Sequence, residues 1–288
     1  MVPEKKGDEE KLMNALLRIS EEDPTCKVEK SVEGKQLIVR CMGDVHLDHI
    51  MTKMERKYGI KGVLQDVYIP YRETIKGKAT AEGKHKKQSG GHGQYGHVIL
   101  DIEPLTNGES FEFVDDIFGG AVPKQYIPAV EKGVKETLEK GLIAGYPMIN
   151  IKVTLKDGSY HSVDSSEMAF KVAAALALKK GVPEANPVLL EPVYNVDVVV
   201  PEEYMGDIMG DFSSRRGRIL GMEHHRNRKG IIVVKAQVPL SEMKGYVTVL
   251  RSMTQGKGTF NMEFFAYEEV PKKLMDEIIA KAQEAKKE

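Results

Sequence analysis

The C-terminal part of the chain, residues 192–267, arranges its apolar segments in an order that few folds share. Segments typical of β-strands are 192–200, 218–224, 230–238 and 258–267. One helix is expected to begin at Pro201-Glu202-Glu203, since proline and acidic residues favour a first helical turn, and a second covers 241–253. The order strand–helix–strand–strand–helix–strand is the split βαβ pattern of a ferredoxin-like sandwich. We therefore expect an α+β architecture here.

Residues 1–75 repeat this order without its opening strand. An apolar stripe predicts a helix that ends before Asp23-Pro24, a hairpin follows over 26–42, and Asp44 can cap a second helix. A last strand is expected over 63–70. Only Met1-Val2-Pro3 stand where the first strand would end. The pattern predicts a ferredoxin-like domain with its first strand missing, in a shortened chain.

A third unit, residues 76–188, lies between these two segments. Its expected elements, in chain order, are strands at 97–104 and near 111–114, a helix over 123–140, a strand over 148–155, a turn at Asp157-Gly158 and a helix over 165–180. The tail 271–287 has the apolar spacing of an amphipathic helix. The predicted domains are therefore 1–75, 76–188, and 189–288 with its C-terminal helix.

Composition excludes several classes of protein. The 288 residues are 41% hydrophobic and carry a net charge of −1, as in ordinary globular proteins. The longest apolar run, 172–178, is too short to span a bilayer, and the hydrophilic N-terminus lacks the apolar centre of a signal peptide. Cys26 and Cys41 fall on two adjacent predicted strands, as reduced thiols of a cytosolic protein. We expect a cytoplasmic protein without a membrane partner.

Positive charge is concentrated in two glycine-containing segments. Residues 76–97 hold five lysines and one acid, and residues 210–230 hold six cations and two acids. Local clusters of this kind can neutralise phosphates although the whole molecule is nearly neutral. The alternative interpretation is a pair of solvated loops.

The first of these segments contains the run GKHKKQSGGHGQYGH, residues 83–97. Its lysines supply charge, its glycines allow close approach of backbone N–H groups, and Tyr95 offers a face on which a base can stack. The histidines are spaced seven and five residues apart without cysteine, which does not fit a metal site. The run therefore predicts contact with a phosphate backbone.

The run YHSVDSSE, residues 160–167, combines His, Ser and Asp without the features of a catalytic triad. No nucleophile elbow accompanies it, and a helix start is favoured, with Asp164 or Ser165 as the cap. His161 then lies on the loop before the cap, where it can contact a partner. No GxxxxGK[ST] run occurs, so we expect this chain not to bind or hydrolyse GTP by itself.

Four motifs, in order, resemble the C-terminal half of bacterial elongation factor G. They are EEDPT (21–25), GKHKKQSGGHGQYGHV (83–98), SYHSVDSSEMAFK (159–171), and EEYMGD…RRGRILGME with LRSMTQGKGTF (202–260). The resemblance implies domains III, IV and V of that factor. These are two ferredoxin-like modules flanking a ribosomal-protein-S5-domain-2-like domain with a left-handed βαβ crossover.

The resemblance also implies a function on the ribosome. Domain IV would reach the decoding centre and displace the tRNA–mRNA module through two tip loops, 89–96 and 160–165, with His161 as the functional histidine. Domain V would approach the sarcin–ricin loop of ribosomal RNA. The implied RNA-binding residues are Lys84, Lys86, Lys87, Ser89, Gly90, Gly91, His92, Gly93, Gln94, Tyr95, His161, Asp164, Ser165, Arg215, Arg216, Arg218 and Lys229. GTP and Mg²⁺ would belong to missing N-terminal domains, so this chain, expected to be a monomer, would itself be no enzyme and hold no cofactor.

Other interpretations stay open. His85, Lys86, His92, Ser162 and the segment 224–229 depart from the usual family residues, which suggests a paralogue that acts in ribosome recycling or protection. A stand-alone RNA-binding module would use aromatics on a sheet, but Phe260, Phe264, Phe265 and Tyr267 share one strand without a matching set beside it. A hydrolase built on His161, Asp164 and Ser165 is the weakest alternative.

Overall fold

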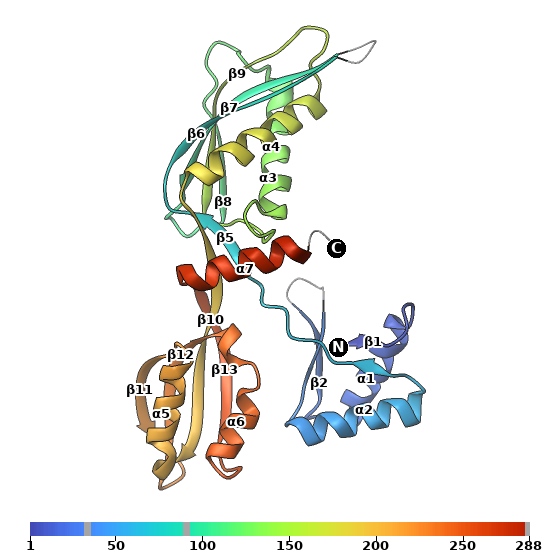
Figure 1. The fold of residues 1–288 in the computed structure, drawn as a ribbon, viewed down its shortest axis with the longest axis vertical. Helices are drawn as coiled ribbons and strands as arrows, with labels where there is room; N and C mark the ends of the chain where they lie inside the picture. Colours follow the sequence, from blue (N-terminus) through green and yellow to red (C-terminus); the bar gives the residue numbers. More distant parts are fainter. Residues whose placement is uncertain (32–35, 89–92, 286–288) are drawn as a thin grey trace. The chain divides into compact units, whose positions relative to one another are not determined.

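The computed structural model describes residues 1–31, 36–88 and 93–285, and shows the predicted α+β class. By its internal contacts the chain divides into two compact units. One comprises Met1–Pro70 with Pro192–Ala266, and the other comprises Tyr71–Glu191 with Tyr267–Glu288 (Figure 1). None of the helices in the described part is both long enough and apolar enough to cross a membrane.

The N-terminal segment of the first unit holds two helices and a hairpin. Helices α1 (Glu9–Glu22) and α2 (Asp44–Tyr58) pack with the antiparallel strands β2 (Lys27–Lys30) and β3 (Leu37–Arg40). Buried side chains of both helices form the core, among them Leu12, Leu16, Ile50 and Met54. The predicted helices and hairpin are confirmed here, and the turn at 32–35 lies outside the described residues.

The strand predicted over 63–70 is wrong. Only β4 (Gly62–Val63) forms, paired antiparallel with β1 (Val2–Pro3). Because β1 offers two residues, the rest of the segment has no partner strand among the described residues, and Leu64 and Val67 are exposed. The apolar residues of 64–70 therefore do not form a strand, because a strand needs a neighbouring strand to which its backbone can hydrogen-bond.

The C-terminal segment of the first unit is the split βαβ sandwich predicted from the sequence. Its strands are β10 (Pro187–Pro201), β11 (Arg218–His224), β12 (Ile231–Pro239) and β13 (Thr259–Glu269), in the sheet order β11-β12-β10-β13. A short 3-10 turn, η2 (Glu202–Tyr204), leads into α5 (Met205–Ser214). The helix expected over 241–253 is divided into η3 (Leu240–Met243) and α6 (Tyr246–Met253), since Gly245 adopts a left-handed φ of 69°.

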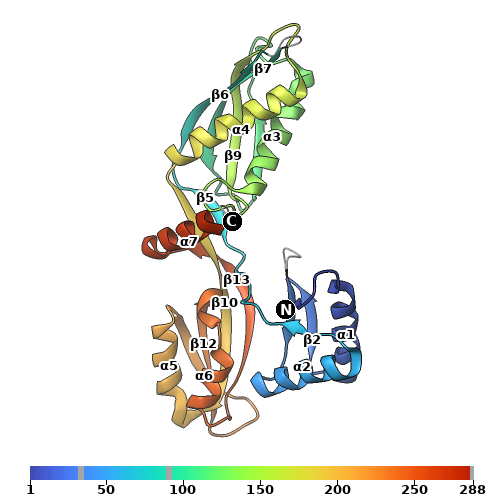
Figure 2. The same ribbon diagram turned by 45° about the vertical axis from the view of Figure 1, so that its right-hand side comes forward.

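The second unit is built on a four-stranded sheet. Its strands β6 (Ala79–Lys87), β7 (Gln94–Pro104), β9 (Ile151–Ser159) and β8 (Phe111–Asp115) lie in that order, and only β8 and β9 are parallel to each other. The turn η1 (Lys124–Tyr126) and helix α3 (Ile127–Lys140) connect β8 to β9, so the parallel βαβ unit that the resemblance implies is present. Helix α4 (Glu167–Glu184) lies beside α3 and runs along β6 and β7 (Figure 2).

Strand β5 and the last helix also belong to the second unit. Strand β5 (Arg72–Ile75) pairs with the first residues of β10, and helix α7 (Lys272–Ala285) packs on Leu189, Val270 and Tyr71. The predicted ranges 76–188 and 189–288 stay a prediction; the described contacts group α7 with the middle of the chain.

Two local expectations in the second unit are wrong. Asp157-Gly158 is not a turn, because β9 continues through it to Ser159, with a bulge opposite Ile99 and Leu100. Helix α4 is capped by neither Asp164 nor Ser165: the Ser166 hydroxyl accepts the Ala169 N–H at 3.2 Å. The side chains of Asp164 and Ser165 bond to the β6–β7 hairpin instead.

Candidate nucleic-acid interface

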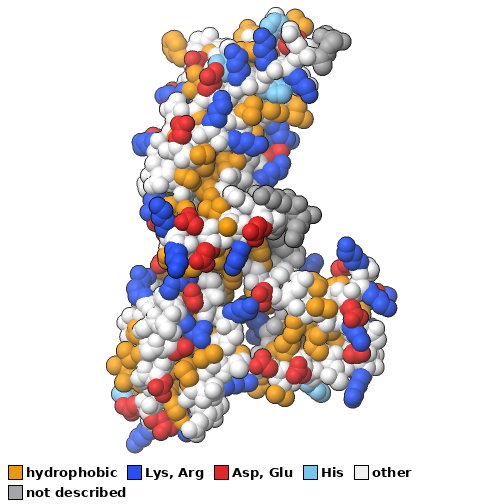
Figure 3. Space-filling view, in the orientation of Figure 1, with side chains coloured by type: hydrophobic (Ala, Val, Ile, Leu, Met, Phe, Trp, Pro, Cys, Tyr) orange, Lys and Arg blue, Asp and Glu red, His pale blue; other side chains and the backbone are white. Residues whose placement is uncertain are grey.

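The β6–β7 hairpin presents lysines and an aromatic ring on one face. Lys84 pairs with His97 in the ladder, and Lys86 pairs with Tyr95. Because side chains alternate across a strand, these four residues share a face, while Gly83 and Gly96 face α4. The ammonium nitrogen of Lys84 lies 5.9 Å from the centroid of the Tyr95 ring. Lysines and histidines gather at this end of the second unit (Figure 3).

A second loop, residues 160–166, begins where β9 ends. His161 is exposed, and its ring lies 6.4 Å, centroid to centroid, from the ring of Tyr95. Its Nδ1 accepts the backbone N–H groups of Asp164, at 3.2 Å, and Val163, at 3.3 Å. A neutral ring that accepts at Nδ1 carries its proton on Nε2. His161 is therefore arranged as a hydrogen-bond donor at Nε2.

Hydrogen bonds join the two loops. The Asp164 carboxylate accepts the Gly93 N–H at 3.0 Å, and its backbone carbonyl accepts the Tyr95 N–H at 2.8 Å. The Ser165 hydroxyl donates to the Tyr95 carbonyl at 3.0 Å and accepts the His161 N–H at 2.9 Å. A Cβ on residue 93 would lie 2.8 Å from the Asp164 carboxylate, so a side chain there would displace that carboxylate. We call the joined segments 84–88, 93–97 and 160–166 the tip.

Two residues that were not predicted from the sequence, Ser159 and Tyr126, form hydrogen bonds to residues of the tip. The Ser159 hydroxyl lies 2.8 Å from the Tyr95 hydroxyl and 2.7 Å from Nδ1 of His97. Tyr126 donates its hydroxyl hydrogen to the Ser165 carbonyl at 3.2 Å, and its ring stacks on the buried ring of Phe170. No local pattern marks Ser159 or Tyr126, because their partners lie 39 to 64 positions away.

Comparison with known families agrees with this architecture. Residues 1–66 match the family model for elongation factor G domain III, residues 68–186 match domain IV, and residues 188–278 match the elongation factor G C-terminus. The chain belongs to the elongation factor G family. The three matches follow one another in the order that the motifs predicted, and the tip lies within domain IV.

A solved structure shows the same relationship. A crystal structure of the protein ttk003000868 from Thermus thermophilus is 42% identical, superposes with a TM-score of 0.83, and matches 98% of this chain. The present chain spans 42% of the length of that protein.

Several residues that the elongation factor G resemblance assigned to RNA binding lie outside the described part of the chain. These are Ser89, Gly90, Gly91 and His92. Lys84, Lys86 and Lys87 are exposed, and the side-chain oxygen of Gln94 accepts a hydrogen bond from Nε2 of His85 at 2.9 Å. Of the described glycines in this run, Gly83 and Gly96 allow α4 to approach: a Cβ at Gly96 would lie 2.5 Å from the backbone of Ala169. Helix packing, rather than a ligand, accounts for these two glycines.

The arginines predicted in domain V have partners within the domain. Arg215 bonds to the Asp211 carboxylate at 2.7 Å and the Glu242 carbonyl at 2.6 Å, and its guanidinium lies 5.1 Å from the Tyr246 ring centroid. Arg216 pairs with the Glu242 carboxylate at 2.8 Å, and Arg218 bonds to the Gln237 side chain at 3.1 Å. Lys229 is exposed in the turn between β11 and β12. The RNA contacts of all four stay predictions.

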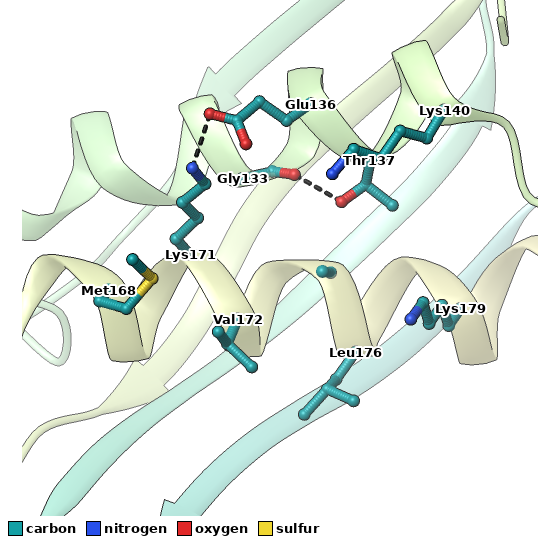
Figure 4. A pocket seen from close by; sticks show the side chains of 10 residues that line it. Gly133, Glu136, Thr137, Lys140, Met168, Lys171, Val172, Leu176 and Lys179 are labelled. Atoms are coloured by element: carbon teal, nitrogen blue, oxygen red, sulfur yellow. Dashed lines mark hydrogen bonds and ion pairs between the residues drawn. The ribbon is translucent and has the colours of Figure 1, made fainter.

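The geometry does not favour the hydrolase alternative. The hydrogen bonds of the Ser165 hydroxyl go to the backbone of Tyr95 and His161, so it is not paired with the imidazole as a nucleophile would be. A groove of about 270 Å³ lies between α3 and α4 (Figure 4). There Lys171 pairs with Glu136 at 2.6 Å, and apolar Val172 and Leu176 line the other side. Neither place combines a nucleophile with a base.

The RNA-module alternative gains one observation. Tyr194 on β10 packs edge-on against Phe264 on the neighbouring β13, with ring centroids 5.8 Å apart. A single tyrosine is not a matching set of two or three aromatics, so the expectation that β13 has no such set beside it stays a prediction. Among residues 1–31, 36–88 and 93–285, no group of three or more His, Cys, Asp or Glu side chains could hold a metal ion.

Proposed function

We propose that this chain is the ribosome-binding part of a translational GTPase that promotes tRNA–mRNA translocation, with domain IV acting as a tRNA-mimicking arm. Family membership supports a role in translation. The observation that carries the proposal is the tip, in which lysines, Tyr95 and His161 from two distant segments are held together by the hydrogen bonds of Asp164 and Ser165.

The tip would act by position and charge. Lys84 and Lys86 would neutralise phosphates, the ring of Tyr95 would contact a base or ribose, and Nε2 of His161 would donate to an RNA oxygen. No covalent step is needed, because a rigid charged arm that occupies the decoding centre displaces the module already bound there. In domain V, exposed Lys229 would face the sarcin–ricin loop, while Arg215 holds the domain together.

The nucleotide chemistry would reside elsewhere in the parent protein. Domains III to V include no GTPase domain. GTP and Mg²⁺ would be bound by further domains, and this portion would transmit their state to the ribosome. A protein that acts on ribosomes would be located in the cytoplasm, and we expect it to act there as a monomer.

Ribosome pelleting across a salt series tests the tip. The triple variant Lys84→Ala, Lys86→Ala, Lys87→Ala should bind more weakly and lower the slope of log affinity against log salt by about 2, since each phosphate contact contributes about 0.7 to 0.9. Lys272→Ala, Lys273→Ala, Lys281→Ala removes three exposed lysines of α7 in the same unit and should keep the native slope.

The salt dependence of the two triple variants shows whether the tip contacts RNA. Equal slopes for both triple variants would contradict the proposal that the tip meets RNA. His161→Ala should weaken binding at every salt concentration with little change of slope, because a hydrogen bond to RNA, unlike the neutralisation of a phosphate, releases no counterion. Introduced into the full-length protein, the same change should slow single-round translocation.

A further inference from the structure

The two cysteines of the first domain lie at the open end of one hairpin, Cys26 directly before β2 and Cys41 directly after β3. In the hairpin, Lys27 pairs with Arg40 and Val28 pairs with Val39. One step further toward its open end, the same antiparallel register places Cys26 opposite Cys41. Both are free thiols.

The hydrogen bonds of the hairpin define the geometry of this pair. The Ser31 N–H donates to the Gln36 carbonyl at 2.8 Å, so Ser31 and Gln36 form a hydrogen-bonded pair. Hydrogen-bonded and non-hydrogen-bonded pairs alternate along an antiparallel ladder. The ladder itself ends at Lys27 and Arg40; continued by one residue to Cys26 and Cys41, five pairs from Ser31 and Gln36, the alternation gives a non-hydrogen-bonded pair, in agreement with the Cys26 N–H donating to the Asp23 carbonyl at 3.0 Å. Such pairs bring Cα atoms to about 4.5 Å, within the span that a disulfide bridges.

Both side chains point to the same core. Cys26 belongs to the buried cluster formed with Leu12 and Leu16, and Cys41 packs against that cluster beside Val39. Cys26 is fully buried, whereas Cys41 is half-buried, so an oxidant in solution reaches Cys41 first. Burial raises the pKa of the Cys26 thiol, with further contributions from the Asp23 carboxylate and from Cys41 itself. Cys41 is thus placed to react and Cys26 to resolve.

We propose that Cys26 and Cys41 form a reversible intramolecular disulfide when the protein meets a peroxide. The Cys41 thiolate attacks one peroxide oxygen, the O–O bond breaks, and the departing oxygen takes up a proton to leave as water, giving a sulfenic acid. The Cys26 sulfur then attacks the Cys41 sulfur, the S–O bond breaks, and a second water leaves with the Cys26 proton. Two thiols are oxidised by two electrons, the peroxide is reduced, and a low-molecular-weight dithiol reverses the change.

The bond would join the end of the α1–β2 connection to the start of the β3–α2 connection. Cys26 follows α1 by four residues, and Cys41 precedes α2 by three. Oxidation would therefore close the open end of the hairpin between the two helices of domain III. This site is separate from the tip, so the proposal of a disulfide does not depend on the proposed role in translocation.

Peptide mapping tests the proposal directly. The chain is treated with dilute hydrogen peroxide, remaining thiols are alkylated, and trypsin, cutting after Arg18, Lys27, Arg40 and Lys53, releases peptides 19–27 and 41–53. We expect these two peptides to be joined within monomeric protein, with the loss of two hydrogen atoms, and to separate after dithiothreitol. Cys41 sulfinic acid with Cys26 still open to alkylation, or joining only between chains, would overturn the proposal.

Two variants separate the roles. In Cys26→Ala, peroxide should leave a sulfenic acid on Cys41 that dimedone traps, because the resolving thiol is absent. In Cys41→Ser, buried Cys26 should stay unmodified at the same peroxide concentration. If Cys26→Ala does not fold, Cys41→Ser still decides the point: oxidation of Cys26 at the native rate in that variant would contradict the order of reaction.

Discussion

The carboxylate of Asp164 accepts the backbone N–H of Gly93 at 3.0 Å, across 71 positions of sequence. The carbonyl of the same residue accepts the Tyr95 N–H at 2.8 Å. Asp164 therefore joins the loop 160–166 to the start of β7, the second strand of the β6–β7 hairpin. A residue that the sequence pattern assigned to helix capping thus holds the tip together, and Ser166 takes over the cap.

Removing the Asp164 carboxylate should loosen the tip. In Asp164→Ala, the Gly93 amide should exchange with solvent about tenfold faster, since a hydrogen bond to a charged group is worth about 1.5 kcal/mol or more. Asp164→Asn keeps an acceptor oxygen and is the matched control, with an expected change of less than half that size on the logarithmic scale. Hydrogen exchange followed by NMR measures both. An unchanged Gly93 rate in Asp164→Ala would show that the contact is not formed in solution.

Glu73 on β5 holds a second loop through its carboxylate. Although fully buried, it accepts five consecutive backbone N–H groups, from residues 142 to 146, at 2.6 to 3.0 Å. A buried carboxylate with this many donors is satisfied without a cation. The loop after α3 is therefore shaped around one side chain.

Glu73→Gln should destabilise the second unit by about 3 to 5 kcal/mol, because the amide NH₂ group cannot accept and leaves buried N–H groups unpaired. Urea denaturation followed by circular dichroism measures the loss. Glu139→Gln, on the exposed face of α3, is the isosteric control and should stay within about 0.5 kcal/mol. A Glu73→Gln variant as stable as this control would contradict the structural role of the carboxylate.

The predictions that succeeded from sequence rest on local patterns. Helix α2 has its apolar stripe and a left-handed Gly59 at its C-terminus, and both signals are visible within fifteen residues. The strand over 63–70 was wrong because strand formation depends on a partner, which β1 supplies for two residues. Asp157-Gly158 has turn composition, yet the ladder to β7 continues through it.

In the tip, too, local sequence patterns do not encode the contacts between distant segments. Its lysines and Tyr95 were predicted from residue types, and alternation along β6 and β7 then accounts for the shared face of Lys84, Lys86 and Tyr95. The contacts of Asp164 with Gly93 and of Ser159 with Tyr95 join positions 64 to 71 apart, which no local pattern encodes. Charge clustering also does not reveal that Arg215 is paired with Asp211, since composition does not distinguish a cation that meets solvent from one in an ion pair; the RNA contact of Arg215 stays a prediction.

Substitution of Tyr246 in domain V is expected to stabilise the protein, whereas Glu73→Gln is expected to destabilise it. The Tyr246 ring stacks on buried Phe212 and meets half-buried Phe260 edge-on, but its hydroxyl is buried and has no hydrogen-bond partner among the described residues. Burial raises the pKa of this phenol well above its usual range. Tyr246→Phe should therefore increase the free energy of unfolding by about 1 kcal/mol, because an unpaired buried polar group is removed.

Tyr126→Phe is the control for this change. The Tyr126 hydroxyl does have a partner, the Ser165 carbonyl at 3.2 Å, so its removal should cost about 1 kcal/mol. Urea denaturation of the two variants should give changes of opposite sign. If Tyr246→Phe lowers stability as much as Tyr126→Phe, the buried hydroxyl is hydrogen-bonded in solution.

The pH dependence of domain III should depend on Glu22, the last residue of α1. Hydrogen bonds from Lys53, at 2.6 Å, and from Lys57, both on α2, lower the pKa of its carboxyl group from 4.5 to about 2. The folded-state pKa lies below the unfolded one, so the ionised carboxylate stabilises the fold above about pH 4.5, and this contribution is lost as the pH falls toward 2.

NMR titration should give a Glu22 pKa near 2, rising toward 4.5 in the double variant Lys53→Met, Lys57→Met. In high salt it should also rise, because these groups are exposed and screened. Glu22→Gln should flatten the fall in thermal stability between pH 4.5 and 2, and a Glu22 that titrates near 4.5 in the native protein would contradict the bridge between the two helices.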